Sequence, residues 1–383
     1  MADTATPLKM AMIGGGAGSF IGPIHRIAAE LDGEIRLVAG AFSRDFERSR
    51  ATGAAWGLDP DRIYPDYQTL IAAETARPDG VDLLAIVTPN NLHFPIAKAG
   101  LEAGLHVMCD KPATLTLAEA LALRAVVAEH DRQFGLTYTY AGYPMVREAR
   151  EVVRRGDLGQ VRKVVVEYSQ GWLAEPLERG EHKQAGWRAD PAQGGLGGCI
   201  ADIGVHALDL AERVSGLRLE RLCPDLSSLV EGRVLDDDCN MLWRFEGGVP
   251  GVLVASQIAA GDRNGLRIRV YGERGGLDWS HDQPNILTLN WLDHPTQVLH
   301  AAAPYLSAAG RGPARTPTGH PEGFIEAFAN LYRDFAGAIR GQPPGPGAGT
   351  PGIEVGVRGM AFIQCAVAAS RAEAGWVRLE DAY

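Results

Sequence analysis

An aspartate and a histidine stand four residues apart in a glycine-rich stretch near the middle of the chain. Asp202 and His206 would project from one face of a helix that starts there. A neutral imidazole can take the proton of an alcohol while a hydride leaves the same carbon, and the carboxylate can orient the imidazole or a neighbouring hydroxyl of the substrate. A structural alternative stays open, in which Asp202 pairs with the helix dipole and His206 has no chemical role.

A lysine that could assist this chemistry follows a short apolar segment upstream, in the sequence Cys-Asp-Lys-Pro (109–112). At the end of a strand, the charge of Lys111 would favour alkoxide character on a substrate oxygen and would lower the pKa of a nearby histidine. Pro112 can carry a cis peptide bond that directs the lysine. The alternative is an ordinary surface lysine in a loop. The expected catalytic residues are Lys111, Asp202 and His206.

A glycine cluster opens the chain directly after Lys9–Ile13, which is predicted to be a strand. In the sequence Met-Ile-Gly-Gly-Gly-Ala-Gly-Ser-Phe-Ile-Gly (12–22), glycines allow a tight turn and a close approach to a pyrophosphate, and the following helix start offers free N–H groups. The third glycine of the usual G-x-G-x-x-G fingerprint would fall at Ser19, so a lengthened turn is predicted. The residues expected to hold the phosphates are Gly14, Gly16, Gly18, Ser19 and Phe20.

Two further turns complete the expected dinucleotide site. After the predicted strand Ile35–Phe42, an acid would bind the adenine ribose of NAD and an arginine could bind the 2′-phosphate of NADP. Because Arg44 and Asp45 are both present, the sequence favours NAD without excluding NADP, and Arg44 could also be a solvated charge. After the predicted strand Val81–Val87, Thr-Pro-Asn-Asn (88–91) suits either an ordinary turn or the nicotinamide half. The other expected cofactor-binding residues are Ser43, Arg44, Thr88, Asn90, Asn91, His93 and Lys111, although His93 could instead cap the next helix.

The first 140 residues alternate short apolar segments with segments of helical spacing. This alternation predicts an α/β fold with a doubly wound parallel sheet, a Rossmann domain over residues 1–140. Residues 141–383 contain several runs with period-two character and are predicted to form an α+β domain on a large, mostly antiparallel open sheet. Residues 171–199 are expected to be a polar, glycine-rich loop, followed by a helix at about Ile203–Ser215. The Gly-Gly pairs at 247–248 and 275–276 are predicted hairpin turns.

Composition argues against several classes of protein. The chain has 383 residues, enough for two domains, and its net charge of −10 argues against a nucleic-acid-binding protein. Its five cysteines are scattered without a Cys-x-x-Cys pair, so neither disulfides nor a metal site are expected. No apolar run reaches the roughly 18 residues that span a bilayer, and no signal peptide is visible. We therefore expect no membrane partner and a cytoplasmic location.

Several motifs resemble those of the glucose–fructose oxidoreductase/inositol dehydrogenase/MocA family, and the resemblance covers nearly the whole chain. They are the glycine turn (14–22), Thr-Pro-Asn (88–90), Asp-Lys-Pro (110–112), where the family usually has Glu-Lys-Pro, and Gly-Cys-Ile-Ala-Asp-Ile-Gly-Val-His-Ala-Leu-Asp (198–209). The resemblance implies a Rossmann domain followed by a large mixed-sheet domain. It also implies that Lys111, Asp202 and His206 are catalytic, and that dimers or tetramers assemble through the open sheet.

Within this family the chain resembles the inositol, levoglucosan and L-glucose dehydrogenases, in the segments 140–147, 183–188 and 319–323. A cyclic polyol needs many hydrogen bonds around one ring, and polar loop residues could supply them. Besides the catalytic residues, the expected substrate-binding residues are Tyr140, Gln170, Lys183, Arg188 and His320. Each of them could also be an ordinary loop residue, and His320 could come from a neighbouring subunit.

The sequence thus predicts an NAD-dependent dehydrogenase that oxidises a ring hydroxyl of a cyclic polyol or sugar. His206 would be the acid/base, Lys111 its electrostatic partner and Asp202 the orienting group. Two alternatives stay open: an NAD-dependent glycosidase on the same scaffold, and a non-catalytic sensor of sugars or nucleotides. The glycosidase would accumulate no NADH, and a sensor would have no reason to keep these three residues together.

Overall fold

The computed structural model describes residues 6–180 and 182–382, and its internal contacts divide the chain into two compact units. The first unit consists of the described part of Met1–Thr139 together with Phe324–Pro344 and Gly349–Val357. The second unit consists of Tyr140–Gly323, Gly345–Ala348 and the described part of Arg358–Tyr383. Two late segments of the chain therefore group with the first unit, while the expected domain boundary between residues 140 and 141 stays a prediction.

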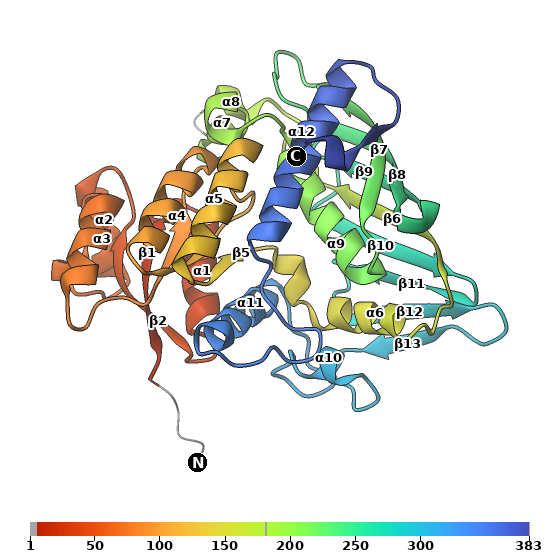
Figure 1. Cartoon of the computed structure of the whole chain (residues 1–383), viewed down its shortest axis with the longest axis horizontal. Coiled ribbons are helices and arrows are strands. Elements are labelled where there is room, and N and C mark those ends of the chain that lie inside the picture. Colours follow the sequence, from red (N-terminus) through yellow and green to blue (C-terminus); the bar gives the residue numbers. More distant parts are fainter. Residues whose placement is uncertain (1–5, 181, 383) are drawn as a thin grey trace. The chain divides into compact units, whose positions relative to one another are not determined.

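The first unit is built on a five-stranded parallel sheet in the order β2-β1-β3-β4-β5 (Figure 1). Each parallel pair needs a crossover connection, and helices provide them. The strands are β1 (Leu8–Gly14), β2 (Ile35–Ala41), β3 (Leu83–Val87), β4 (His106–Cys109) and β5 (Phe134–Leu136). The helices are α1 (Ile21–Glu30), α2 (Phe46–Ala55), α3 (Tyr67–Ala76), α4 (His93–Glu102), α5 (Leu117–His130) and α11 (Phe324–Ile339). The predicted Rossmann-type α/β sheet is confirmed.

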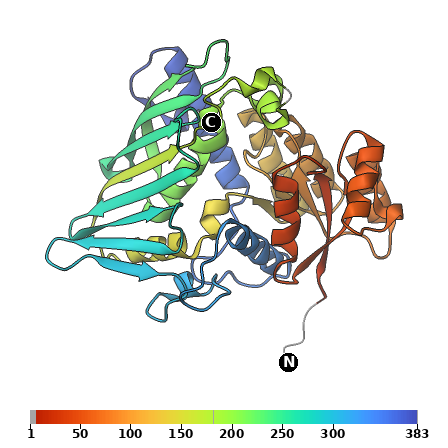
Figure 2. The same ribbon diagram turned by 180° about the vertical axis from the view of Figure 1, so that it is seen from behind.

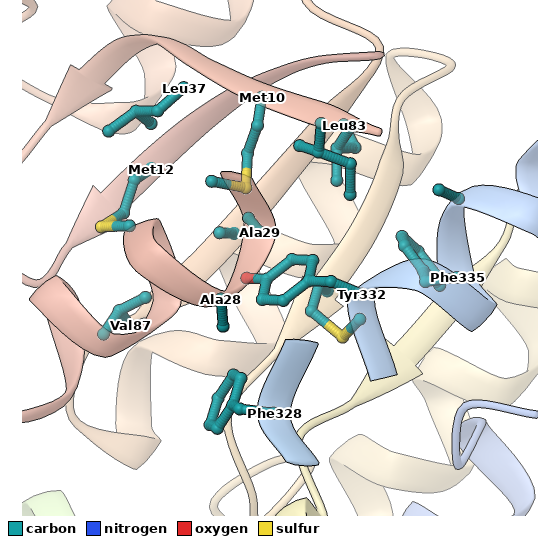
Figure 3. Close-up of a cluster of buried hydrophobic side chains, with 14 of the residues drawn as sticks. Met10, Met12, Ala28, Ala29, Leu37, Leu83, Val87, Phe328, Tyr332 and Phe335 are labelled. Atoms are coloured by element: carbon teal, nitrogen blue, oxygen red, sulfur yellow. The ribbon is translucent and has the colours of Figure 1, made fainter. Parts of the chain in front are cut away.

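The core of this unit joins the start of the chain to α11. Met10 and Met12 of β1 are buried against Ala28 of α1 and against Phe328 and Tyr332 of α11 (Figure 3). These apolar side chains leave water together, which is the main favourable contribution to folding. A helix from residues 324–339 therefore completes the layer that covers the first strands.

The second unit is built on a nine-stranded sheet in the order β13-β12-β11-β10-β6-β9-β8-β7-β14 (Figure 2). Its pairings are antiparallel except that β6 runs parallel to β9. The strands are β6 (Val161–Ser169), β7 (Leu219–Ser227), β8 (Asp238–Phe245), β9 (Pro250–Ser256), β10 (Gly265–Gly272), β11 (Gly275–Ser280), β12 (Ile286–Trp291), β13 (Gln297–His300) and β14 (Val377–Arg378). The predicted large, mostly antiparallel sheet is confirmed.

Helices cover one face of this sheet. The helices of the unit are α6 (Pro144–Arg154), α7 (Lys183–Arg188), α8 (Pro191–Gly194), α9 (Val205–Ser215), α10 (Ala308–Arg311) and most of α12 (Ile353–Arg371). Helix α9 contacts β6 and β10, and α6 contacts β11 and β12 (Figure 1). Side chains along β8 and β10 alternate between buried and more exposed positions, as a sheet with one covered face requires.

Two local expectations for this unit were wrong. Residues 171–199 are not only loop, because α7 and α8 lie there, each begun by a capping side chain: His182 accepts from the amide of Ala185, and Asp190 from that of Ala192. The pair Gly275-Gly276 is not a turn but the beginning of β11. A Cβ on Gly275 would lie 2.6 Å from the carbonyl oxygen of Asn290, so strand packing explains this glycine.

Helix α12 is the one helix in the described ranges that is long and apolar enough to cross a membrane by length and composition. Most of it is buried inside the protein, as is usual for a core helix. This helix is therefore weak evidence for a membrane span.

We predict that a buried ion pair makes a large contribution to the stability of the first unit. Arg62 Nε donates to Glu74 Oε1 at 3.0 Å, and Tyr64 donates its hydroxyl proton to the same oxygen at 2.9 Å. Glu74→Ala would leave the buried guanidinium of Arg62 without its carboxylate. The free energy of unfolding in urea should fall by about 3–5 kcal/mol.

The matched control is Glu102→Ala, which removes the exposed i,i+4 pair with Lys98. This change should cost less than about 1 kcal/mol. Equal losses in the two variants would contradict a special contribution from the buried pair.

Candidate active site

The turn between β1 and α1 is lined by backbone because its glycines leave no room for side chains. Gly14 and Gly15 have positive φ angles of 81° and 72°. A Cβ on Gly14 would lie 2.4 Å from the carbonyl oxygen of Val87, and one on Gly22 would lie 1.9 Å from that of Gly15. A backbone-lined turn at a helix start fits a dinucleotide pyrophosphate.

The turn is extended by residues 15–20 before α1 begins at Ile21. The amide of Ser19 donates to the carbonyl of Gly16 at 2.9 Å, and the Ser19 hydroxyl accepts from the amide of Gly22 at 3.2 Å. Ser19 thus stabilises the helix start, and the Phe20 side chain is exposed beside it. That Gly14, Gly16, Gly18, Ser19 and Phe20 contact phosphate stays a prediction.

After the end of β2, the side chain of Asp45 caps the next helix. Asp45 accepts hydrogen bonds from the amides of Glu47 and Arg48, at 3.0 and 3.2 Å, and so begins α2. The amide of Asp45 donates to the Ser43 hydroxyl at 3.1 Å. Arg44 is exposed next to it. A contact of Ser43 or Arg44 with the adenine ribose stays a prediction.

The end of β3 holds two buried polar atoms that make no hydrogen bond within the described residues. They are Thr88 Oγ1 and Asn91 Oδ1. Buried polar atoms nearly always have hydrogen-bond partners, so we expect these two oxygens to bind a polar ligand. They belong to the turn from which the sequence predicts nicotinamide contacts, and they fit the carboxamide group of that ring.

His93 lies in the same region but is completely buried. Its Nδ1 is 2.8 Å from the carbonyl oxygen of Pro112, and its Nε2 is 3.0 Å from that of Thr88. Burial lowers the pKa of His93, so the ring stays neutral and can donate to one of these carbonyls at a time. The peptide bond between Lys111 and Pro112 is cis. His93 thus contacts the backbone around Lys111, and its predicted contact with the cofactor stays a prediction.

In the second unit, Asp202 and His206 occupy consecutive helical segments. Asp202 lies in a π-helical turn, Ile200–Gly204, and His206 lies in the first turn of α9. Such π-helical turns are frequent at functional sites. Asp202 Oδ2 accepts from Gln257 Nε2 at 2.8 Å, and its Oδ1 lies 3.5 Å from Arg188 Nε. The carboxylate is therefore held from two sides.

His206 is 8% exposed and packs against Tyr140, with ring centroids 5.0 Å apart in an edge-to-face arrangement. The Tyr140 hydroxyl accepts from Asn264 Nδ2 at 3.1 Å and also shares a short hydrogen bond with the Tyr168 hydroxyl. Tyr168 in turn donates to Asn264 Oδ1 at 2.9 Å, which closes a ring of three polar groups. This ring fixes Tyr140 beside the imidazole.

Sequence reasoning missed Tyr168, Asn264 and Gln257. Tyr168 and Asn264 lie at the ends of neighbouring strands, and nothing in the local sequence distinguishes them from other strand residues. Gln170, which the sequence indicated, donates to Asn264 Oδ1 at 2.7 Å and accepts from Trp172 Nε1 at 2.9 Å. Its side chain is thus part of the same network.

Arg188 and His320, which the sequence also indicated, make their hydrogen bonds and ring contacts with other residues. The guanidinium of Arg188 stacks 4.2 Å from the centre of the Trp187 ring, and its buried Nε makes no hydrogen bond to the described residues. The side chain of Lys183 lies outside the described part of the chain. His320 is exposed, with its Nδ1 3.3 Å from the carbonyl oxygen of Pro317. Contacts of these residues with a substrate stay predictions.

Asp236 holds the segment that leads into the Asp202 turn. Its carboxylate accepts from the amides of Gly198 and Ile200, each at 2.7 Å, and its carbonyl accepts from the amide of Cys199 at 2.7 Å. A Cβ on Gly198 would lie 2.2 Å from that carbonyl oxygen, so the close approach requires glycine. Burial raises the pKa of Asp236 to about 6, although the two amides act in the opposite direction.

Comparison with known proteins extends this description to the whole chain. Residues 8–138 match the family model described as "Oxidoreductase family, NAD-binding Rossmann fold", and residues 146–278 match the GFO/IDH/MocA C-terminal domain. The uncharacterized oxidoreductase YfiI of Bacillus subtilis (strain 168) is 35% identical over 98% of this chain and 97% of its own length.

Two further relatives are named for a dehydrogenase activity. An inositol dehydrogenase homolog of Azotobacter vinelandii, solved in complex with NAD+, has a TM-score of 0.93 and 39% identity over 98% of both chains. Its complex with NADH and myo-inositol has a TM-score of 0.91 and 38% identity, again over 98% of both chains. A levoglucosan dehydrogenase of Pseudarthrobacter phenanthrenivorans is 25% identical over 68% of this chain and 66% of its own length.

We predict that Asp236 makes the free energy of unfolding depend on pH. Because its pKa in the folded state is raised from 3.8 to about 6, the folded protein binds this proton more tightly than the unfolded chain. This group therefore favours folding increasingly as the pH falls from 7 to 4 and disfavours it as the pH rises. Relative to Asp236→Asn, the free energy of unfolding of the wild type should gain at most about 2 kcal/mol over that interval, measured in urea.

Asp66→Asn serves as a control of opposite sign. Asp66 caps α3 by accepting from the amide of Thr69 at 2.7 Å, and this bond lowers its pKa. Relative to that variant, the wild type should lose stability as the pH falls. Parallel pH profiles for the wild type and Asp236→Asn would overturn the interpretation of Asp236.

Proposed function

Because the chain belongs to the GFO/IDH/MocA oxidoreductase family, we propose that it is an NAD-dependent dehydrogenase that oxidises a ring hydroxyl of a cyclic polyol or sugar. The substrate would be of the inositol, levoglucosan or L-glucose type. The observation that carries the proposal is the arrangement around His206. Its nearly buried imidazole lies at the start of α9, directly after the π-helical turn that carries Asp202, and Gln257 and Arg188 hold the Asp202 carboxylate in place. A relative with 38% identity that was solved with NADH and myo-inositol supports the same substrate class.

The first unit would hold the cofactor. The glycine turn after β1 would bind the pyrophosphate, and the unsatisfied oxygens of Thr88 and Asn91 would accept from the carboxamide of the nicotinamide. When bound, NAD supplies the acceptor for a hydride. We propose NAD rather than NADP because a relative covering 98% of the chain was solved with NAD+, while exposed Arg44 keeps binding of NADP open to test.

The proton chemistry would belong to His206 and Lys111. Neutral His206 would take the proton of the substrate hydroxyl, while the ammonium of Lys111 would stabilise negative charge that develops on the same oxygen. Asp202 would accept a hydrogen bond from a neighbouring hydroxyl or orient the imidazole. Tyr140, Gln170, Lys183, Arg188 and His320 would contribute to binding, with Tyr140 acting mainly through its contact with the His206 ring.

The protein would act in the cytoplasm. Cys109, Cys199 and Cys239 are buried thiols without a disulfide, and burial raises their pKa well above the ordinary value. Such thiols stay protonated and need no pairing, which suits a reducing compartment.

The direct test is NADH formation with a panel of ring substrates. We expect activity with at least one of myo-inositol, scyllo-inositol, levoglucosan, D-glucose, L-glucose and galactose, with NAD preferred over NADP. In His206→Ala, kcat/KM for that substrate should fall by roughly 10²–10⁴-fold because the general base is lost.

The control is His294→Ala, which removes an exposed histidine that contacts Asp293. Its kcat/KM should stay within about twofold of the wild type, as is usual for surface substitutions. A His206→Ala variant that keeps wild-type activity would refute the proposed role of His206. Release of an aryl aglycone without NADH would instead identify a glycosidase.

We also propose that copies of the chain assemble through the uncovered face of the nine-stranded sheet. Leu242 and Val254 are 49% and 40% exposed there, and Leu242 is directly opposite Val252 on the neighbouring strand. Exposed apolar side chains that are grouped on one face are typical of interfaces. Arg267 and Arg269 pair with Asp278 and Glu167 beside this apolar group.

The oligomer can be tested with Leu242→Arg. A guanidinium in the middle of an apolar interface would be desolvated without a partner, so the variant should shift to a smaller species in size-exclusion chromatography with light scattering. Leu292→Arg changes another exposed leucine, in the turn between β12 and β13, and should leave the mass unchanged. A wild-type monomer, or identical masses for wild type and both variants, would argue against this interface.

A further inference from the structure

Two buried histidines contact the residues on either side of Lys111, and the proposed chemistry does not use them. His25 in α1 and His93 at the start of α4 are both completely buried. His25 contacts the side chain of Asp110, and His93 contacts the backbone of Pro112. Buried ring nitrogens need polar partners, and each of these two histidines finds one of its partners at a residue directly next to Lys111.

The contact on the Asp110 side is a chain of three groups. The Tyr332 hydroxyl lies 2.6 Å from His25 Nδ1, and His25 Nε2 lies 3.0 Å from Asp110 Oδ1. Thr137 donates its hydroxyl proton to the same carboxylate oxygen at 2.6 Å. Three distant parts of the sequence, in α1, α11 and the segment after β5, therefore converge on Asp110.

The proton positions in this chain follow from the ionisation of its ends. Burial acts to raise the pKa of Asp110, but the charge and hydrogen bond of His25 and the hydrogen bond of Thr137 outweigh it and lower the pKa to about 2. Burial raises the pKa of Tyr332 well above its ordinary value, so the phenol keeps its proton. Because the ionised carboxylate can only accept, His25 Nε2–H donates to it, while the Tyr332 hydroxyl shares a hydrogen bond with Nδ1.

Loss of the Tyr332 hydroxyl would leave the buried His25 Nδ1 without its hydrogen-bond partner. The imidazole would then be held by a hydrogen bond at Nε2 only, and its contact with Asp110 would be less firmly fixed. Thr137 would remain as the second donor to Asp110. The turn that carries Lys111 would be less firmly held, although the phosphate turn after β1 would be untouched.

We propose that His25 and Tyr332 are positioning residues for Lys111, which act through Asp110. This inference rests on the proposed role of Lys111 in the dehydrogenase reaction. It assigns to α11, a helix from the last fifth of the chain, a part in holding a residue at the end of β4. His93 supports the other side of the same turn through Pro112 and the end of β3.

The test is Tyr332→Phe, which removes one oxygen atom, compared with Tyr64→Phe as a matched control. Tyr64 also donates a buried phenolic hydrogen bond to a carboxylate in the first unit, but to Glu74 rather than to the Lys111 turn. We expect similar losses of melting temperature. Only Tyr332→Phe should lower kcat, by roughly three- to tenfold, with KM for NAD within about twofold of the wild type.

A double variant separates positioning through Lys111 from a general structural effect. In a Lys111→Ala background, Tyr332→Phe should no longer change kcat, because the two changes act on one residue. An equal loss of kcat in both backgrounds, or an equal loss in Tyr64→Phe, would overturn the proposal.

A readout that does not depend on turnover distinguishes a failure of this inference from a failure of the proposed function. The rate at which an amine-acylating reagent modifies Lys111 is followed by mass spectrometry in the full-length protein. Lys111 should react at least about twofold faster in Tyr332→Phe than in the wild type, and at the wild-type rate in Tyr64→Phe. Equal rates in all three proteins would refute the positioning role even if no substrate were found.

Discussion

Most buried polar groups in this protein lie within hydrogen-bond distance of another polar group, and both candidate sites are built from such pairs. In the first unit, the carboxylate of Asp110 is only 19% exposed, and its pKa is lowered because His25 and Thr137 donate to it. In the second, Asp236 fixes the entry to the π-helical turn through two backbone amides. Each pair joins segments that are far apart in the chain, so these hydrogen bonds fix the direction of the reactive side chains.

Three buried polar atoms that make no such hydrogen bond within the described ranges lie where a ligand is expected. The buried oxygens of Thr88 and Asn91 have no partner among the described residues, and both follow the strand at whose carboxyl end the sequence predicts the nicotinamide. The buried Nε of Arg188, next to Asp202, is a third case. A buried polar atom without a partner costs free energy, and a bound cofactor or substrate can remove that cost.

Much of the fold could be predicted because its signals are local. The apolar run Val81–Val87 indicated a strand buried on both faces of a parallel sheet, and β3 (Leu83–Val87) is buried at every position. The resemblance of Asp-Lys-Pro (110–112) and residues 198–209 to the family is confirmed. The prediction failed at a glycine that has a non-local reason and in a loop whose local helix caps were overlooked. Gly275 is required by packing against Asn290 on the next strand, and α7 and α8 depend on caps within a segment that is rich in turn residues.

The sequence by itself determined the order of strands and helices, the glycine turn and the identity of Lys111, Asp202 and His206 as candidates for chemistry. These features depend on residue types and on spacings of a few residues, and both can be read directly from the sequence. Only the tertiary structure decided which groups support the candidates: Tyr332 and His25 behind Asp110, and Gln257, Tyr168 and Asn264 around Asp202 and Tyr140. Tyr332 and His25 are 307 positions apart, and a hydrogen bond over that separation exists only after the sheet and its helices have packed.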